Sequence, residues 1–535
     1  MEKNIIIDNG SYEIKYGLNT DVCPIHVPNC IYRTPDKRVV LGDQLSQLQD
    51  TSNIHIRRPI EANGQLTQWL MEKQIWDETF LRHKGQALGD DFLKDANLIY
   101  LETPITLTKF QNHVDQVIFE EYGVANYYRC SGGSLAPWLT ADDASDSSLT
   151  TDVSNEVEDE KNKTEDTKKT NQSKKNSKAK GKQPKPQTVN HYSDFQLVID
   201  SGFDSTWVIP VIYGLPYWKA VKRMPIGGRI LNGYLRELIS FRHYNVTDET
   251  LLVNKIKETS CYVTTDFNES LAKIEALRKK PSRKKQRVLS KDPINTPNNH
   301  DKKSKDEDSS TVRVKDPRYP QTSDDLVLNY VLPSTFSTAA TISSSSSSSS
   351  TTTSIDLGHT LTTAQLQTTP HAKLQNLQII QLQDERFTVP ELIFQPELAG
   401  LHKAGLIQTV QESLKLCPEL IRPLLLANVV TIGGGFNLPG FKERLVSELK
   451  AVIGVDEIVR VFEFDNAGCA DVWKSGSGKG KDKDVKRMDF SEVGFHSAKK
   501  FYEFEGFKKT CVSRDEYMEF GAEYTQEKFG YKLNV

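Results

Sequence analysis

IIIDNGSYEIKYG, residues 5–17, consists of two β-prone runs joined by Asp8-Asn9-Gly10. Asn-Gly between such runs is the strongest short-range signal for a β-hairpin. Residues 197–209 read LVIDSGFDSTWVI and repeat the pattern, with three aliphatic residues followed by Asp200-Ser201-Gly202. A repeat this far apart predicts two copies of one domain, each placing an acidic strand end and a glycine turn at the same edge.

The chain has 535 residues, which is enough for several domains with a large buried core. Its net charge of -3 indicates no particular partner. The seven cysteines are scattered without a CxxC pair, which is typical of reduced thiols in an intracellular protein. Because the first apolar run is short and no stretch reaches the length of a membrane span, we expect a soluble protein without a secretory signal.

Three polar segments interrupt the globular pattern, at residues 141–191, 277–323 and about 335–372. They lack apolar periodicity, and the third includes eight consecutive serines, Ser343 to Ser350. Such composition predicts disorder. Since the entropy of closing a loop rises slowly with its length, surface turns can hold inserts of this kind without unfolding the host domain.

The remaining chain alternates strand and helix patterns. LIYLETP, residues 98–104, predicts a strand, and the following segment predicts a helix with Thr108 and Gln111 at capping-box spacing. NVVTIGGGFNLPGFKERLVSELK, residues 428–450, predicts a strand, a glycine-rich turn and a helix with an apolar face at Phe441, Leu445 and Leu449. The fold class is therefore α/β, in which ligands usually bind at the turns between strands and helices.

The two hairpins have the residue types that a phosphate site needs. Gly10 and Gly202 let backbone N–H groups approach an anion closely, because glycine lacks a Cβ. Asp8 and Asp200 are placed to hold the water shell of Mg²⁺, and Lys15 is placed to reach a phosphate. Each hairpin alone is also compatible with an ordinary turn and a solvated acid. Together with a third glycine-rich turn, Gly433-Gly434-Gly435, the two favour a nucleotide cleft of the split-ATPase type.

These segments resemble a known family. IIIDNGSYEIKYG resembles the first phosphate loop of actins and actin-related proteins, LVIDSG the second, and VVTIGGGFNLPGF the adenosine loop. The resemblance covers essentially all of the chain outside the three polar inserts. It implies an actin-like split ATPase fold, with two duplicated halves around a nucleotide cleft. The first half would span residues 1–196 and be completed by about 490–535, and the second would span residues 197–489.

The resemblance also implies a ligand, ATP or ADP with Mg²⁺, and the residues that hold it. Asp8 and Asp200 would lie near the metal and bind it through its water. The phosphates would contact Gly10, Ser11, Lys15, Ser201 and Gly202. The adenosine would contact Lys257, Glu258, Gly433 and Gly434.

Departures from the family concern hydrolysis. The glutamine that orients the attacking water falls on Gly132, and the assisting histidine falls on Trp207. Neither can accept a proton, and loss of positioned proton-transfer groups typically slows a reaction by about 10² to 10⁴. We therefore expect a cleft that binds nucleotide more readily than it hydrolyses it, and we assign no catalytic residues.

Two further departures bear on binding. Phe203 and Asp204 stand where actins have Asp-Gly, so an extra carboxylate is expected to weaken phosphate binding. The family's Trp-Ile-Gly-Gly stretch is poorly matched by CADVWKSGSGKGK, residues 469–481, which leaves the last wall of the adenine pocket open.

Within the family, the resemblance is to a subunit of a Swr-type chromatin remodeller, which exchanges canonical histone dimers for dimers of the Z-type variant. It implies a non-enzymatic docking subunit in the nucleus, with a cytoplasmic pool. Its partners would be a Snf2-type motor subunit and a zinc-finger HIT-type subunit, and it would contact nucleosomes directly or through them. We expect neither membrane binding nor formation of a homopolymer. The alternatives are an actin-fold ATPase, a sugar-kinase relative, or a cytoskeletal filament protein.

Three weaker signals are given structural interpretations. GSGKGK, residues 476–481, has Trp473 and Gly480 where a P-loop needs Gly and Ser or Thr, so we interpret it as a linker. RKKPSRKKQR, residues 278–287, is either a solvated loop or a nuclear-import or nucleic-acid segment. Trp69 and Trp76, seven residues apart, are expected to pack in the core.

Overall fold

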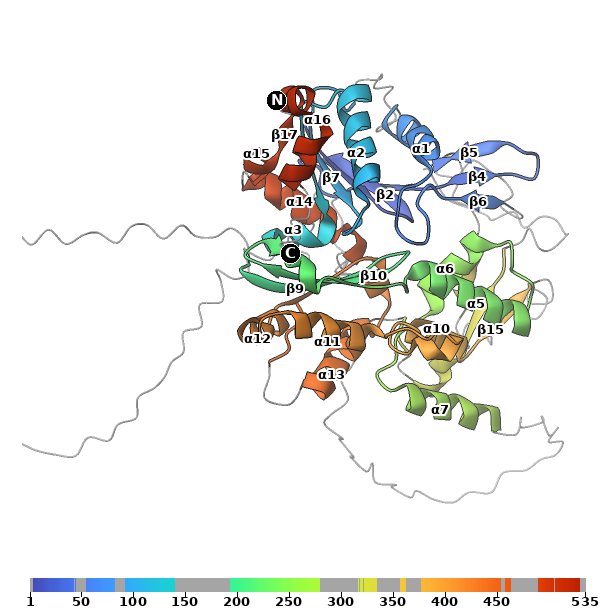
Figure 1. Cartoon of the computed structure of the whole chain (residues 1–535). Coiled ribbons are helices and arrows are strands. Elements are labelled where there is room, and N and C mark those ends of the chain that lie inside the picture. Colours follow the sequence, from blue (N-terminus) through green and yellow to red (C-terminus); the bar gives the residue numbers. More distant parts are fainter. Residues whose placement is uncertain are drawn as a thin grey trace, which may run out of the picture.

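Two β-sheets, each built on one of the two hairpins, form the centre of the computed structural model (Figure 1). The structure describes most of the chain outside the polar segments. The described residues are 3–42, 44, 54–81, 92–139, 193–279, 316, 318–320, 322–333, 357–361, 377–453, 458–462, 489–504 and 506–529.

The first sheet has six strands. Their order across the sheet is β17 (Val512–Ser513), β8 (Asn126–Ser131), β7 (Asn97–Glu102), β1 (Asn4–Asn9), β2 (Glu13–Leu18) and β3 (Ile25–Pro28). β1 and β2 form the predicted hairpin, with Asp8 opposite Lys15. β7 pairs in parallel with β1, so its carboxyl end lies at the same edge as Asp8.

The second sheet repeats this arrangement. Its strands are β11 (Leu215–Pro216), β10 (Thr206–Ile212), β9 (Phe195–Ser201) and β16 (Val429–Ile432), with β12 (Lys222–Met224) also paired to β10. β9 and β10 form the second predicted hairpin, with Trp207 opposite Asp200. β16 pairs in parallel with β9, as β7 does with β1. Both hairpin predictions are confirmed, whereas the residue boundaries assigned to the two halves stay predictions.

Two helices lie between the sheets, α3 (Gly132–Leu139) and α14 (Val493–Glu503) (Figure 1). One side of this pair contributes Leu135 and Phe495 to a core with Ile6 and Leu101 of the first sheet. The other side contributes Ala136 and Val493 to a core that contains Trp207 of the second sheet. The paired helices therefore join the two sheets on the side away from the loop tips.

Further helices cover the outer faces. Those beside the first sheet are α1 (Trp69–Leu81), α2 (Thr108–Gln116), the π-helical turn η3 (Val117–Glu121), α15 (Gly506–Thr510) and α16 (Arg514–Phe529). Those that share a core with the second sheet are α5 (Gly228–Arg242), α6 (Thr250–Ser260), α10 (Glu385–Glu391), α11 (Leu406–Leu416), α12 (Arg422–Leu426) and α13 (Phe441–Ile453). α7 (Phe267–Lys279) lies farther from this sheet and packs its Ile274 against Tyr262 and Phe387 (Figure 1). Short 3-10 turns are η4 (Trp218–Ala220), η5 (Ser323–Leu326), η7 (Pro396–Ala399), η8 (Glu419–Ile421), η9 (Gly434–Asn437) and η12 (Phe490–Glu492).

Two small sheets complete the fold. One contains β5 (Val39–Leu41), β4 (Ile31–Arg33) and β6 (His55–Arg57), and the other contains β14 (His359–Leu361), β13 (Leu328–Val331) and β15 (Ile379–Leu382). The first lies on the same side of the molecule as α5 and α6 in Figure 1.

The predicted disordered inserts are partly corrected. The insert at 335–372 contains β14, which pairs with β13, and the insert at 277–323 includes the end of α7 and residues that pack on the core. Tyr319, for example, packs edge-to-face against Tyr262 at 5.2 Å between ring centroids. These contacts form with distant residues, so local composition did not reveal them. The insert at 141–191, the rest of the other two inserts, GSGKGK and the basic stretch beyond Lys279 lie outside the described residues.

The capping box predicted at Thr108 and Gln111 is wrong. α2 begins at Thr108, and its N-cap residue is Leu107, which makes no side-chain cap. Gln111 instead donates to Glu102 at 2.6 Å, because the end of β7 presents a buried carboxylate there. Local spacing identified the helix but not the tertiary partner of its first turn.

Other core predictions are confirmed. Trp76 is fully buried, and Trp69 packs against it at 5.6 Å between ring centroids. Phe441, Leu445 and Leu449 all lie on the buried face of α13. The six cysteines within the described residues are free thiols. None of the described helices combines the length and apolar character that a membrane span requires.

Candidate functional site

A cavity of about 1490 Å³ lies between the two hairpins. Nearly all of the residues predicted for a nucleotide site line it: Asp8, Gly10, Ser11, Lys15, Asp200, Gly202, Lys257, Glu258, Gly433 and Gly434. Ser201 is the exception, because its buried hydroxyl lies 3.2 Å from Thr206 Oγ1, behind the loop. The fold therefore brings together, from five separate elements, residues that the sequence spreads over more than four hundred positions.

Lys15 and Asp8 form an ion pair across the first hairpin. Lys15 Nζ lies 3.1 Å from Asp8 Oδ2, and the Lys15 side chain is almost completely buried. Burial opposes the charge on this ammonium, but Asp8 and the further acids Glu13 and Asp489 together outweigh burial and raise the pKa of Lys15. The ammonium is therefore charged, held in place, and available at the floor of the cleft.

Asp200 faces this pair from the second hairpin. Burial, with a further contribution from Asp8, raises the pKa of Asp200 to about 7. No group of three or more His, Cys, Asp or Glu side chains within the described residues is arranged to hold a metal ion by itself. Two acids facing one cavity suit Mg²⁺, which takes few protein ligands and keeps its water.

The loop tips present unused hydrogen-bond donors. The backbone N–H groups of residues 11–12 donate no hydrogen bond to any described residue, and neither do those of residues 203–205. Successive free N–H groups in a turn form an anion-binding concavity. Because both tips line the cavity, the donors fit a phosphate group lodged between them.

The other end of the cavity fits a nucleoside. Lys257 Nζ donates to Asn254 Oδ1 at 2.9 Å, and burial lowers the pKa of Lys257 to about 8. Gly434 has open space where a Cβ would stand, so a flat ring can approach its backbone. Gly433 has a φ of 95°, and a Cβ there would collide with Ser201, which explains glycine at this turn.

The last wall of the adenine pocket, which the sequence did not assign, is formed by another part of the chain. CADVWKSGSGKGK lies outside the described residues, but Asp489, Phe490, Ser491 and Gly494 line the cavity. Asn437 of η9 donates to Asp489 Oδ1 at 2.6 Å, which ties this wall to the glycine turn. The start of α14 therefore completes the cleft.

Asp204 does not stand as an uncompensated charge beside the phosphate position. Its Oδ1 lies 2.5 Å from Arg229 Nε, and only 4% of its side chain is exposed. Because the guanidinium of α5 neutralises the carboxylate, the repulsion expected from the sequence is removed. The sequence did not reveal this pairing because Arg229 lies on a different element, and the effect of Asp204 on phosphate binding stays a prediction.

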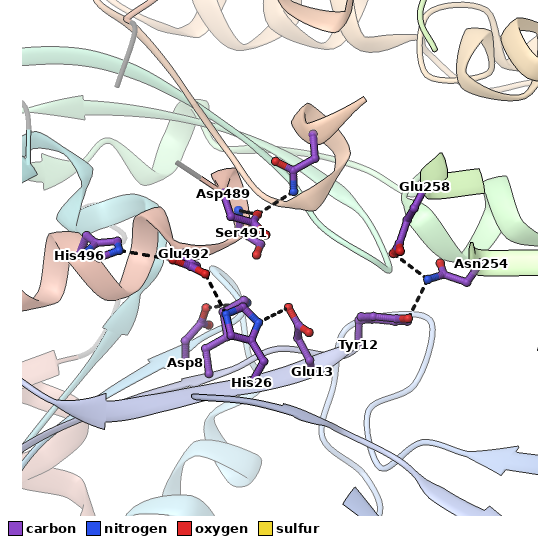
Figure 2. A network of polar contacts seen from close by, with 12 residues as sticks. Asp8, Tyr12, Glu13, His26, Asn254, Glu258, Asp489, Ser491, Glu492 and His496 are labelled. Carbon is purple, nitrogen blue, oxygen red and sulfur yellow. Dashed lines mark hydrogen bonds and ion pairs between the residues drawn. The ribbon is translucent and has the colours of Figure 1, made fainter. Parts of the chain in front are cut away.

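An aromatic and arginine cluster closes the mouth of the cleft. The rings of Tyr12 and Phe203, one from each loop tip, lie 5.0 Å apart. Arg58 sits over both rings at 4.9 and 4.8 Å and donates to the carbonyl of Tyr12 at 2.8 Å. Tyr12 Oη also accepts from Asn254 of α6 at 2.7 Å (Figure 2). These contacts hold the two sides of the cleft together without a ligand.

The cavity is also lined by the two positions at which the resemblance places the water-orienting glutamine and the assisting histidine, Gly132 and Trp207. Gly132 begins α3 and has no side chain to orient a water. Trp207 belongs to β10 and is buried in the core, with only 5% of it exposed. Its indole N–H can donate but cannot accept a proton. The cavity therefore has residues suited to a phosphate, and neither Gly132 nor Trp207 can accept a proton from water.

A histidine bridge links the first sheet to the start of α14. His26 of β3 lies between Glu13 and Glu492, with each ring nitrogen 3.0 Å from a carboxylate oxygen (Figure 2). Burial opposes the charge on His26, but the two hydrogen bonds outweigh it and raise its pKa to about 9. The same contacts, with His496, overcome burial and lower the pKa of Glu492 to about 2. His26 is the one imidazole among the described residues that line the cavity, and both of its nitrogens are occupied.

The bridge predicts a pH dependence of stability. A histidine whose pKa is raised by folding contributes stability fully below its unfolded value near 6.5, and loses that contribution as the pH rises through about 9. The free-energy difference between the wild type and His26→Gln should thus shrink between these limits. Urea unfolding at several pH values measures it. His55→Gln, at an exposed position on β6, is the matched control, and a pH-independent effect of His26→Gln would contradict the assignment.

Several functional candidates were missed by the sequence argument. Tyr12 lies inside the first quoted loop, so its place at the tip could have been noticed. Arg58, Asn254 and the pair of His26 with Glu492 gave no local signal, because each acts through a partner far away in the chain. Only the folded arrangement identifies them.

Comparison with known proteins agrees with this geometry. The family model for actin matches residues 1–497 of the chain. The chain is 33% identical to actin-like protein ARP6 of Candida glabrata over 534 residues, covering 99% of both chains. It is 32% identical to actin-like protein ARP6 of Eremothecium gossypii over 536 residues, covering 99% of both. It is also 32% identical to actin-like protein ARP6 of Saccharomyces cerevisiae, covering 99% of this chain and 98% of that one.

Proposed function

The chain belongs to the actin family, with an actin-like α/β fold, and on that premise we propose that it is a structural subunit of a chromatin remodelling complex. In this role it helps to exchange canonical histone dimers for Z-type variant dimers by docking other subunits, with little or no ATP hydrolysis of its own. The single observation that supports the non-enzymatic part is that Gly132 and Trp207 line the cleft at the family's two water-activating positions, beside residues suited to a phosphate.

ATP or ADP with Mg²⁺ is the proposed ligand, and its role is structural. The residues suit it: Lys15 offers a buried positive charge, Asp8 and Asp200 face the metal position, and both loop tips offer free N–H donors. A bound nucleotide supplies a negatively charged bridge between the two hairpins. The residues around the nucleotide bind and orient it, and the rings of Phe203 and Tyr12 exclude water from the cleft.

The positions at which the family orients the attacking water do not provide a general base. His26 is held in its charged form by Glu13 and Glu492, so it cannot accept a proton near neutral pH. Gly132 and Trp207 stand where the family has its water-orienting groups. The cleft therefore serves to stabilise the fold, and the outer surfaces bind the partner subunits.

The proposed partners are a Snf2-type motor subunit and a zinc-finger HIT-type subunit, in the nucleus with a cytoplasmic pool. Contact with nucleosomes would be direct or through these subunits, and no homopolymer is expected. These assignments rest on the resemblance to the relatives that are named actin-like protein ARP6.

Purification of the tagged chain from native nuclear extract tests the proposal. The expected result is a particle far larger than the 535-residue chain that contains a Snf2-type motor and a zinc-finger HIT-type protein, identified by mass spectrometry. The untagged strain is the control for unspecific capture. Recovery of the chain alone, or sedimentation as a filament in polymerising salt, would contradict the proposal and favour a cytoskeletal protein.

A further inference from the structure

A second cavity, of about 560 Å³, opens on the outer side of the ring of Phe203. It lies between the end of β6 on one side and helices α5 and α6 on the other. Phe203 lines both this cavity and the nucleotide cleft, so one aromatic ring separates them. We name it the arginine pocket, after the arginines on its walls, Arg58, Arg229 and Arg236.

The charge of the arginine pocket is only partly compensated. Arg229 is paired with Asp204, but Arg58 contacts only backbone carbonyls and aromatic rings. Arg236 is half-buried and makes no hydrogen bond or ion pair with any described residue. Guanidinium groups bind carboxylates with paired, charge-assisted hydrogen bonds. The lining also contains one acid, Glu61, which accepts from Thr67 at 2.9 Å and forms no ion pair with Arg58 or Arg236. Two guanidinium groups therefore remain available to an acidic ligand.

A buried acceptor in the same pocket lacks a donor. Asn232 is only 7% exposed and lines the pocket, and its Oδ1 accepts no hydrogen bond. Its Nδ2 donates to Asn254 Oδ1 at 2.9 Å, which fixes the orientation of the amide. A buried polar atom without a partner costs about 1 to 3 kcal/mol, so a ligand that supplies an N–H is favoured here.

Most of the remaining lining is apolar and includes Ile60 and Val253, with the hydroxyl of Thr250 beside them. A ligand that fits must therefore offer an acidic group, an N–H donor and an aliphatic group together. An inorganic anion lacks the aliphatic part, and a purely apolar ligand leaves the guanidinium groups unpaired. We propose that the arginine pocket binds an acidic peptide segment of a partner, with a carboxylate on Arg58 and Arg236, a main-chain N–H on Asn232, and an aliphatic side chain on Ile60 and Val253.

The position of the pocket gives the bound peptide a structural effect. One wall belongs to the segment that follows β6, and the other belongs to α5 and α6. A ligand that contacts both walls stabilises the arrangement in which they face each other. The peptide should therefore raise the thermal unfolding temperature of the protein, and this effect needs neither nucleotide nor any other subunit.

Fluorescence anisotropy with a labelled peptide of alternating Glu and Leu tests the proposal on the full chain. Arg236→Glu should weaken binding by at least about tenfold, because it replaces attraction by repulsion at a site without other partners. Arg236→Ala should weaken it less. Arg460→Glu is the matched charge reversal at an exposed position outside the pocket, and should change the affinity by less than about twofold.

Three results would overturn the proposal. The first is equal affinity for a control peptide with Lys in place of Glu. The second is unchanged binding by Arg236→Glu, once its unfolding temperature has been shown to match the wild type. The third is stabilisation by inorganic phosphate without any by the peptide, which would mean that the pocket takes a free anion. None of these results depends on the role of the nucleotide cleft or on the remodelling complex.

Discussion

Hydrolysis of bound ATP by the purified protein is expected to be about 10² to 10⁴ times slower than hydrolysis by assembled actin filaments, since two proton-transfer groups are absent. Gly132 and Trp207 line the cavity at the positions of these groups. Both ring nitrogens of His26 are hydrogen-bonded to carboxylates. A single-turnover assay with labelled Mg-ATP measures the rate. Binding is checked separately by filter retention, with Lys15→Met as the variant expected to bind weakly. A wild-type rate like that of filaments would contradict the structural role.

Gly132→Gln offers a gain-of-function control. A Cβ at Gly132 would lie 3.6 Å from the nearest atom of Gly494 and 3.9 Å from Leu101, which is ordinary contact. A Cβ can therefore be accommodated at the start of α3, where Gly132 lines the cavity. We expect it to raise turnover without reaching the filament rate, because Trp207 still lacks an acceptor. A larger stimulation would mean that the indole matters less than its position suggests.

Replacement of Arg129 by methionine is expected to destabilise the protein by about 3 to 5 kcal/mol, because it removes the buried cation that compensates two buried carboxylates. Arg129 Nη1 lies 2.9 Å from Glu102, and its Nε lies 3.0 Å from Asp115, with 2%, 8% and 0% of the three side chains exposed. Burial raises the pKa of both acids even with the arginine present. The loss should therefore be largest at neutral pH and smaller in acid, where the carboxylates become protonated.

Urea unfolding and amide hydrogen exchange measure this effect. Protection should fall in β8, which carries Arg129, and in α16, because Thr525 of that helix donates to Asp115 at 2.8 Å. Arg38→Met is the control, since Arg38 and Asp36 form an exposed pair worth less than about 1 kcal/mol. Equal losses in the two variants would show that the buried network does not stabilise the first sheet.

Local patterns were enough to identify the central framework. Alternating apolar runs around Asn9-Gly10 and Ser201-Gly202 predicted both hairpins, and the spacing from Phe441 to Leu449 predicted α13. These features depend on near neighbours in the chain, so the residues that decide them lie within one window. The family followed from the same loops, and the matches to actin and to the ARP6 proteins confirm it.

Predictions failed where a distant partner decided the outcome. β14 is polar and lies in a serine-rich region, but it pairs with β13. Thr108 has the spacing of a capping residue, but Gln111 bonds to Glu102 instead. In both cases a hydrogen bond to another element outweighs the local preference. No single window of sequence contains both partners.

The sequence by itself determined the fold and the residue types at the hairpin tips, at Gly132 and at Trp207, because these depend on residue type and near spacing. Only the tertiary structure decided how charge is distributed around that cleft. Arg229 neutralises Asp204, His26 bridges Glu13 and Glu492, and Arg58 joins the two loop tips, in each case across elements far apart in the chain. Electrostatic interactions act through space and depend on burial, so they are fixed when the chain folds.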